Sequence, residues 1–147
     1  RLYFNDGKGN FINRENALPE MLSSGSSVSA ADFDRDGQLD LFVGGRVVGG
    51  QYGQSPKSYL LHNKGGTFED VSKAILGEEF LGMVTTSLWT DYNNDGWIDL
   101  FIGNESTHTG NFPCELFINK GDGTFEEKIV GSGYWNRSTV ANRKKSI

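Results

Sequence analysis

Short hydrophobic runs alternate with glycine-rich polar turns along most of the chain. Three of these runs each precede an asparagine motif: Leu2–Phe4, Tyr59–Leu61 and Leu116–Ile118. A turn of glycine and polar residues then leads into a second segment that contains a phenylalanine, such as Phe68. Aromatic and branched residues on both sides of a short turn predict a β-hairpin at each of these places.

Two further runs have the pattern Leu-Phe-(Val/Ile)-Gly, at residues 41–44 and 100–103, and each directly follows an acidic segment. Runs of this length are too short for a helix and predict short buried strands. We expect each of these strands to end at its glycine, Gly44 or Gly103.

Two sequence motifs recur with a common period. Asn-x-Gly-x-Gly-x-Phe, or a variant one residue shorter, begins at Asn5, Asn63 and Asn119. Asp-x-(Asp/Asn)-x-Asp-Gly-x-x-Asp begins at Asp32 and Asp91. Successive asparagines are 58 and 56 residues apart, and the two aspartates are 59 apart. Five landmarks on one period indicate an internal repeat, which is the first feature to establish in any fold prediction.

Each repeat of about 58 residues is expected to contain four strands. In the central unit they are placed near residues 27–31, 39–44, 58–63 and 67–70. Four short antiparallel strands per repeat predict an all-β fold of β-propeller blades, with about two and a half repeats and hence an incomplete propeller. Helix should be limited to one turn within residues 70–80. Long loops are expected at residues 45–56 and 105–114.

The repeats suggest a division of the chain into four parts. Residues 1–26 form a partial blade, 27–84 a complete blade with the first acidic loop, and 85–128 a blade with the second. Residues 129–147 contain neither motif, so they are a tail or connecting segment of open role.

The acidic loops have the pattern of calcium sites. Calcium takes six to eight oxygen ligands, and a tight loop supplies them from alternate positions, with a glycine at position 6 for the turn. In the first loop, positions 1, 3, 5, 7 and 9 are Asp32, Asp34, Asp36, Gln38 and Asp40. Position 7 would contribute its backbone carbonyl, and position 9 would close the shell. An EF-hand would close it with a glutamate at position 12, where this chain has a valine or an isoleucine.

The second loop offers the same positions with one fewer carboxylate. Its expected ligands are Asp91, Asn93, Asp95, the carbonyl of Trp97, and Asp99. Without a cation, four carboxylates gathered around one point would repel one another by roughly several kcal/mol. The alternative is that both loops are surface turns that bind nothing, since Asp and Gly favour turns.

These motifs carry a family resemblance. The segments Phe33–Gly44 and Tyr92–Gly103, together with Leu-Phe-x-Asn-x-Gly-x-Gly-x-Phe, resemble FG-GAP or VCBS-type repeats, over residues 2 to about 128. Such repeats form the calcium-bearing blades of integrin α-chain propellers, and similar ones occur in bacterial surface proteins and cartilage acidic proteins. The resemblance implies two structural Ca²⁺ ions, held by the ten loop residues named above.

Composition narrows the classes of function. The 19 acidic residues outnumber the 14 basic ones, giving a net charge of −5, which argues against a nucleic-acid surface. No apolar run is long enough to span a membrane. Aromatic residues make up 12 % of the chain, which favours a folded domain over disorder. The single cysteine, Cys114, excludes an internal disulfide and is expected to be a buried small side chain.

The residues outside the acidic loops do not combine into a catalytic motif. His62 is expected to be structural and His108 a loop histidine, although His108 could contact a ligand. The carboxylate pairs at residues 78–79 and 126–127 point to opposite faces of a strand, as adjacent residues do. No nucleophile motif or phosphate-binding loop occurs. We therefore expect no enzyme activity.

The expected function is that of a calcium-stabilised extracellular scaffold, adhesion or assembly module. External fluids supply the millimolar calcium that such loops can require. Asn104 and Asn136 begin N-x-Ser sequons, which carry glycan only in a secreted chain. One alternative is a lectin-like module that contacts sugar through aromatic residues: Tyr52, Trp89, Trp97 or Trp135. Another is a non-catalytic segment of a larger surface enzyme.

Two and a half repeats do not close a propeller, which typically needs four to eight blades. We expect further blades of a parent chain, or neighbouring copies stacked into a filament, to complete the assembly. Protein or glycan ligands stay unidentified at this stage. Left alone, the outer repeats should expose apolar residues: Leu2, Phe4, Phe117 and Ile118.

Overall fold

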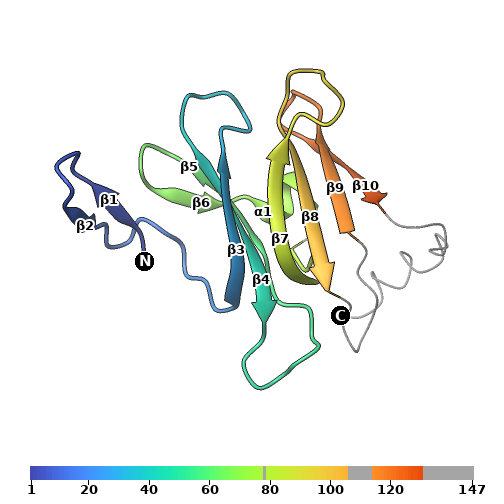
Figure 1. Ribbon diagram of the computed structural model, residues 1–147, viewed down its shortest axis with the longest axis horizontal. Coiled ribbons are helices and arrows are strands. Elements are labelled where there is room, and N and C mark those ends of the chain that lie inside the picture. Colours follow the sequence, from blue (N-terminus) through green and yellow to red (C-terminus); the bar gives the residue numbers. More distant parts are fainter. Residues whose placement is uncertain (78, 106–113, 131–147) are drawn as a thin grey trace.

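Ten strands build three separate antiparallel sheets in the described part of the chain (Figure 1). The computed structural model describes residues 1–77, 79–105 and 114–130. The first sheet is a hairpin of β1 (Tyr3–Asn5) and β2 (Phe11–Asn13). The second has the order β3 (Ser24–Ala31), β4 (Asp40–Val47), β5 (Tyr59–Asn63) and β6 (Phe68–Asp70). The third contains β7 (Met83–Thr90), β8 (Asp99–Glu105), β9 (Cys114–Asn119) and β10 (Phe125–Val130).

Both four-stranded sheets are simple meanders, in which each strand pairs with the next one along the chain. The register is equivalent in the two sheets, since Leu41 pairs with Leu61 and Leu100 with Phe117. A single helical turn, α1 (Ser72–Ile75), follows β6 where one turn was expected. The all-β antiparallel fold class is thus confirmed, while the described residues form two stacked sheets and a hairpin and no closed ring.

The two sheets pack face to face around one hydrophobic core. Its buried residues come from both sheets and from the segment that joins them: Phe33, Phe42, Leu60, Leu76, Leu81, Val84, Leu100, Ile102 and Phe117. Strands β3 and β4 both lie against β7. Serine hydroxyls also join the two innermost strands, because Ser87 of β7 lies 2.6 Å from Ser27 and 2.8 Å from Ser29 of β3.

The expectation that Gly44 and Gly103 end their strands is wrong. Strand β4 continues to Val47 and β8 to Glu105. The glycines instead allow the sheets to approach each other. A Cβ on Gly44 would lie 2.5 Å from Val84 Cγ1, and one on Gly103 would lie 2.7 Å from Thr86 Cγ2. Each glycine therefore makes room for a branched side chain of β7.

The expected exposure of Phe117 and Ile118 is also wrong. Phe117 is 1 % exposed because it faces the core between the two sheets, and Ile118 on the other face of β9 is 7 % exposed. Leu2 is half-buried, packed with a second cluster on the outer face of the β3–β6 sheet. Phe4 remains 37 % exposed, as expected for the hairpin.

The loops differ in part from their expected bounds. Strand β4 extends to Val47 and so removes the first three residues of the loop expected at 45–56. Glu105 and Cys114 belong to β8 and β9, and residues 106–113 of the second expected loop lie outside the described residues. Strand β10 continues to Val130, two residues into the expected tail, because it pairs along β9 as far as Cys114. The proposed division into repeats stays a prediction.

Candidate metal sites in two equivalent loops

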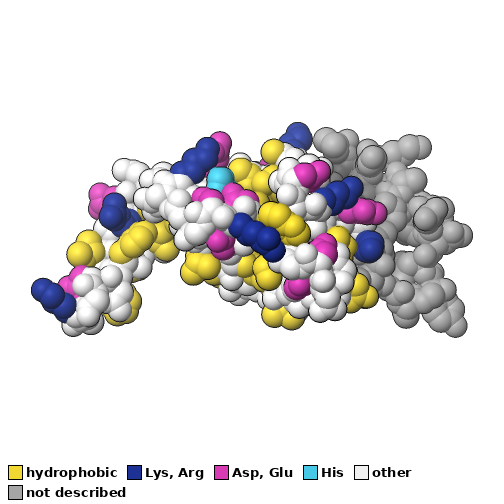
Figure 2. Space-filling model, turned by 90° about the horizontal axis from the view of Figure 1, so that it is seen from above, with side chains coloured by type: hydrophobic (Ala, Val, Ile, Leu, Met, Phe, Trp, Pro, Cys, Tyr) yellow, Lys and Arg dark blue, Asp and Glu magenta, His cyan; other side chains and the backbone are white. Residues whose placement is uncertain are grey.

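The two acidic loops occupy equivalent places, each joining the first and second strands of its sheet. They lie at the same end of the molecule, at the top in Figure 1, where β3 and β7 end. Acidic and basic side chains are interspersed over the surface seen from this end in Figure 2. The repeat thus brings two sets of carboxylates to one end of the stacked sheets.

Hydrogen bonds fold the first loop around its own carboxylates. Asp32 accepts the backbone N–H groups of Asp36 and Gly37, at 3.1 and 3.0 Å. Asp34 Oδ1 accepts the N–H of Asp36 at 3.2 Å, and Asp36 Oδ1 accepts that of Gln38 at 2.8 Å. Gly37 has φ +87°, a left-handed conformation that glycine adopts without strain. The backbone therefore holds the side chains at positions 1, 3 and 5 in fixed orientations.

The second loop repeats this scheme bond for bond. Asp91 accepts the N–H groups of Asp95 and Gly96, at 3.1 and 2.9 Å. Asn93 Oδ1 accepts the N–H of Asp95 at 3.1 Å, and Asp95 Oδ1 accepts that of Trp97 at 2.8 Å. The hydrogen bond from Trp97, followed by that from Asn93, lowers the pKa of Asp95. Two loops of different sequence share one geometry because the residues that accept these bonds recur at the same spacing.

The aspartates at position 9 connect each loop to the hairpin that follows. Asp40 and Asp99 are both 0 % exposed. Asp40 accepts the backbone N–H of Asn63 at 2.8 Å, and Asp99 that of Asn119 at 2.8 Å. Each also accepts the N–H at position 2 of its own loop, from Phe33 at 3.3 Å or from Tyr92 at 2.9 Å. The two repeated motifs of the sequence are therefore in direct contact.

Burial makes the charge on Asp40 unfavourable. Loss of solvent raises the pKa of Asp40 above its usual range, although the N–H groups of Asn63 and Phe33 oppose this, and the nearby Asp34 raises it further. One carboxylate oxygen from each of Asp32, Asp34 and Asp40 lies within 4.8 Å of the others. A cation bound there would offset this repulsion, so the donor set fits a hard divalent ion.

The second loop is less crowded with charge. Asn93 replaces the aspartate at position 3, and among the described residues no three carboxylates of this loop meet within the same distance. Its remaining oxygens still follow the first loop's geometry. The first loop therefore gathers more negative charge than the second.

The side chains at position 7 have roles of their own. Gln38 Oε1 accepts the N–H of Gly65 at 2.8 Å, which joins the first loop to its hairpin turn. The indole ring of Trp97 lies against Gly121, where an added Cβ would come within 2.4 Å of Trp97 Nε1. The binding of calcium by the backbone carbonyl groups of Gln38 and Trp97 stays a prediction.

His62, which the sequence led us to expect as a structural residue, lies beside the first acidic loop. Its Nε2 lies 3.0 Å from Asp34 Oδ2 and 3.6 Å from Asp36 Oδ2. The available signal was its position immediately before Asn63, whose backbone meets Asp40. That position does not show which neighbouring loop the His62 side chain approaches.

The remaining candidate residues are dispersed. Asn104 is half-buried in β8, and its glycosylation stays a prediction. Tyr52 is 64 % exposed, whereas Trp89 stacks on Phe33 with ring centroids 6.2 Å apart, so its ring belongs to the core. Cys114 is a free thiol of intermediate exposure, whereas we expected it to be fully buried. Three other candidates lie outside the described residues: His108, Trp135 and Asn136.

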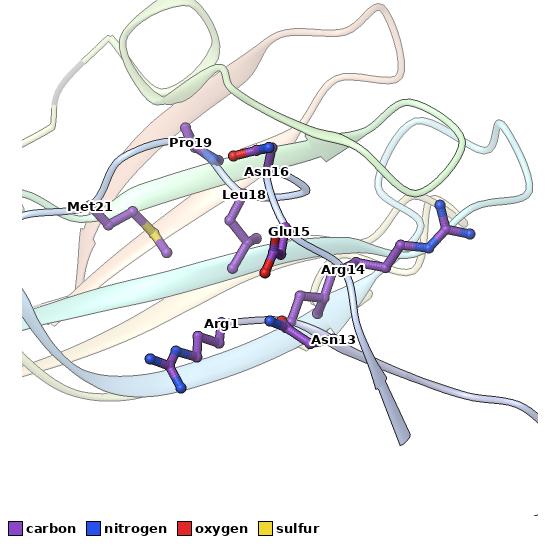
Figure 3. A pocket seen from close by; sticks show the side chains of 9 residues that line it. Arg1, Asn13, Arg14, Glu15, Asn16, Leu18, Pro19 and Met21 are labelled. Carbon is purple, nitrogen blue, oxygen red and sulfur yellow. The ribbon is translucent and has the colours of Figure 1, made fainter. Parts of the chain in front are cut away.

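An open cleft beside the N-terminal hairpin is separate from both loops. It lies between the hairpin and the segment that leads to β3, and its lining includes Leu2, Glu15, Leu18 and Met21. The guanidinium groups of Arg1 and Arg14 extend to opposite sides of it (Figure 3). The two cationic groups diverge, so they do not converge on one ligand position in this cleft.

Comparison with known proteins points to the same repeats. The sequence model of an FG-GAP-like repeat matches residues 1–43 and 91–141, which include both acidic loops. A search of curated proteins found no match. Among the described residues, no helix is long and apolar enough to cross a membrane.

Proposed function

Because this chain belongs to the FG-GAP-like repeat family, we propose that it is a calcium-stabilised, non-catalytic repeat module. The observation that carries the proposal is the hydrogen-bond scheme shared by the two acidic loops, which orients equivalent oxygen atoms in both repeats. Carboxylate and carbonyl oxygens at alternate positions of a tight loop are the ligands that calcium prefers. Repeats of this type often bind calcium, which supports the same assignment.

Calcium would act on the structure through three connected segments. The ligands at positions 1, 3 and 5 lie in the loop, whereas Asp40 begins β4 and is bonded to Asn63 at the end of β5. An ion held by the loop and by Asp40 would join these segments. A ligand that binds only the folded state raises its stability with the logarithm of the free ligand concentration.

The same reasoning leads to an extracellular or surface location. Loops of this kind can require calcium at about millimolar concentration, which external fluids provide. Family members occur in extracellular and surface proteins, which supports this location. As part of the same proposal, the module serves as a scaffold or in adhesion.

Exposed apolar residues support assembly with further repeats. The hairpin of β1 and β2 exposes Tyr3, Phe4, Phe11 and Ile12 by 37–67 %. Its sequence corresponds to the third and fourth strands of the two complete sheets. We propose that another repeat, from a parent chain or a neighbouring copy, packs against this hairpin and covers these side chains.

Thermal unfolding with calcium and with a chelator tests the proposal. The chain should unfold at a higher temperature with calcium, and Asp36→Ala should reduce this difference. The matched control is Asp122→Ala, which removes an exposed aspartate that accepts hydrogen bonds from Thr124 within the β9–β10 turn. An equal unfolding temperature in calcium and chelator would contradict structural calcium.

A further inference from the structure

His62 gives the first acidic loop a nitrogen donor. The residue belongs to β5, where it pairs with Glu69 of β6, and its ring lies 6.1 Å from that of Phe33. Its Nε2 is inaccessible to solvent and has no hydrogen-bond partner among the described residues. The nearest carboxylate oxygen lies 3.0 Å away, on Asp34, at the distance of an ion pair. The imidazole nitrogen is therefore directed at carboxylates of the loop, where it can join them as a donor to a cation.

The distances from Nε2 to the two carboxylate oxygens are those expected between ligands of one small divalent ion. Asp34 Oδ2 lies 3.0 Å from it and Asp36 Oδ2 lies 3.6 Å from it. Ligands bound at about 2.1 Å are roughly 3.0 Å apart at a right angle and roughly 3.4 Å apart at the tetrahedral angle. The three donor atoms can therefore share one ion with little movement, and all three lie within 4.8 Å of one another.

The donor chemistry separates this set from a purely oxygen-lined calcium site. Imidazole nitrogen suits zinc and other transition metals, whereas carboxylate, carbonyl and water suit calcium and magnesium. Histidine nitrogen and aspartate oxygen are both zinc ligands, and three protein ligands leave a further position open on a tetrahedral ion.

The second loop lacks this set. The residue that precedes the hairpin asparagine there is Ile118, in the place that His62 takes before Asn63. Position 3 is Asn93, whose Nδ2 donates to Asp95 Oδ2 at 2.7 Å, so the amide satisfies the carboxylate directly. The two loops thus share a backbone geometry and differ in the donors that they direct toward the adjoining strand.

We propose that the first loop binds a zinc-class transition metal through Asp34, Asp36 and His62, while the second loop keeps a preference for calcium. This inference rests on the proposed function, namely that both loops hold cations. Asp34 also belongs to the carboxylate group with Asp32 and Asp40. Zinc and calcium therefore compete for the first loop and not for the second.

Titration with Co²⁺, a spectroscopic substitute for Zn²⁺, tests the proposal on the full chain. Wild-type protein should show the absorption bands of one Co²⁺ ion with a nitrogen ligand, and Zn²⁺ should displace it. His62→Ile installs the residue of the second loop, and His62→Gln keeps a polar side chain. Both should weaken Co²⁺ and Zn²⁺ binding by about tenfold or more. His108→Gln, which removes the chain's other histidine, is the matched control and should leave binding unchanged.

Calcium titrations of the same variants separate this inference from the proposed function. The second loop should bind Ca²⁺ equally well in wild type and in both His62 variants. Calcium binding with a Zn²⁺ affinity that His62→Ile and His62→Gln leave unchanged would overturn the inference and spare the proposed function. Loss of all calcium binding with His62-dependent Zn²⁺ binding would overturn the proposed function and the calcium preference of the second loop, and would leave the zinc site of the first loop standing. Far-ultraviolet circular dichroism of each variant shows that the comparison is made on folded protein.

Discussion

The guanidinium group of Arg35 lies over the indole ring of Trp97, with Cζ 3.9 Å from the ring centroid. The same group donates a hydrogen bond to the carbonyl oxygen of Gly96. Arg35 is at position 4 of the first acidic loop, and Trp97 is at position 7 of the second. The ring's surroundings also include the backbone of Gly121, so Trp97 is held by groups from both sheets. The two candidate metal sites are therefore in direct contact.

Removing this contact should weaken the packing of the two sheets at the loop end. Arg35→Gln loses a cation–π interaction, which is worth about 0.5–1 kcal/mol at an exposed site. We expect a decrease of that size in the free energy of unfolding, measured by urea denaturation, and a changed tryptophan emission. Arg14→Gln is the matched control, because Arg14 lies over Phe4 within the N-terminal region, 5.0 Å from the ring centroid. Equal effects of the two substitutions would contradict a role for Arg35 between the sheets.

Asn119 makes a second, buried connection between the repeats. Its Nδ2 donates to the carbonyl oxygen of Phe33 in the first loop at 2.8 Å, and the residue is 1 % exposed. Asn119→Asp removes this donor and turns a carboxylate toward two carbonyl groups. We expect the free energy of unfolding to fall by about 1–3 kcal/mol, which is the cost of leaving a buried polar group unsatisfied.

Asn63→Asp is the control for this substitution. Asn63 holds the equivalent place, but its Nδ2 donates to the carbonyl oxygen of Leu39 in the acidic loop of its own repeat, at 3.0 Å, and this hydrogen bond is exposed. In calorimetric unfolding, Asn63→Asp should lose clearly less stability than Asn119→Asp. A larger loss for Asn63→Asp than for Asn119→Asp would contradict the importance of the connection between the sheets.

Gly44 should tolerate no side chain. Gly44→Ala would place its Cβ 2.5 Å from Val84 Cγ1 and 2.8 Å from Val84 Cβ. The sheets would have to separate, at a cost of about 1–3 kcal/mol for an overpacked core. Gly49→Ala is the control, since a Cβ there meets nothing within 4 Å. Chemical denaturation compares the two, and equal stability of both variants would show that the sheets do not approach each other as described.

The ion-paired Asp70 should contribute to stability in a pH-dependent way. Lys57 Nζ lies 2.8 Å from Asp70 and 2.7 Å from Glu79. Burial raises the pKa of Asp70, but hydrogen bonds from Lys57 and Ser72 outweigh it, so the pKa lies below the ordinary value of 3.8. A carboxylate with a lowered pKa stabilises the fold above its unfolded pKa, and this contribution is lost as the pH falls through the folded value.

Asp70→Asn should therefore destabilise the protein at pH 7 by roughly 0.5–1 kcal/mol, as expected for a partly exposed pair. The difference from wild type should shrink as the pH falls below 3.8. Thermal unfolding at several pH values measures it, in calcium-free buffer. In a Lys57→Met background the pH-dependent part should be smaller, and an undiminished pH dependence there would contradict the ion pair as its source.

The course of the two acidic loops was predictable from the sequence because each motif lies within nine residues. Aspartates at alternate positions and a glycine at position 6 fix a loop regardless of what surrounds it. The role of Gly44 was not predictable, since its constraint is Val84, 40 residues further along the chain. The burial of Phe117 likewise depends on how the two sheets stack. The position of His62 beside Asp34 also depends on how the first loop lies against β5.

Calcium titration by isothermal calorimetry tests the central claim most directly. Metal-free wild-type chain should bind two calcium ions, one in each loop. Asp36→Asn and Asp95→Asn should each remove or strongly weaken one of them, while Asp122→Asn leaves both. Wild-type protein that binds no calcium at millimolar concentration, or binds it equally well after both loop substitutions, would contradict the account.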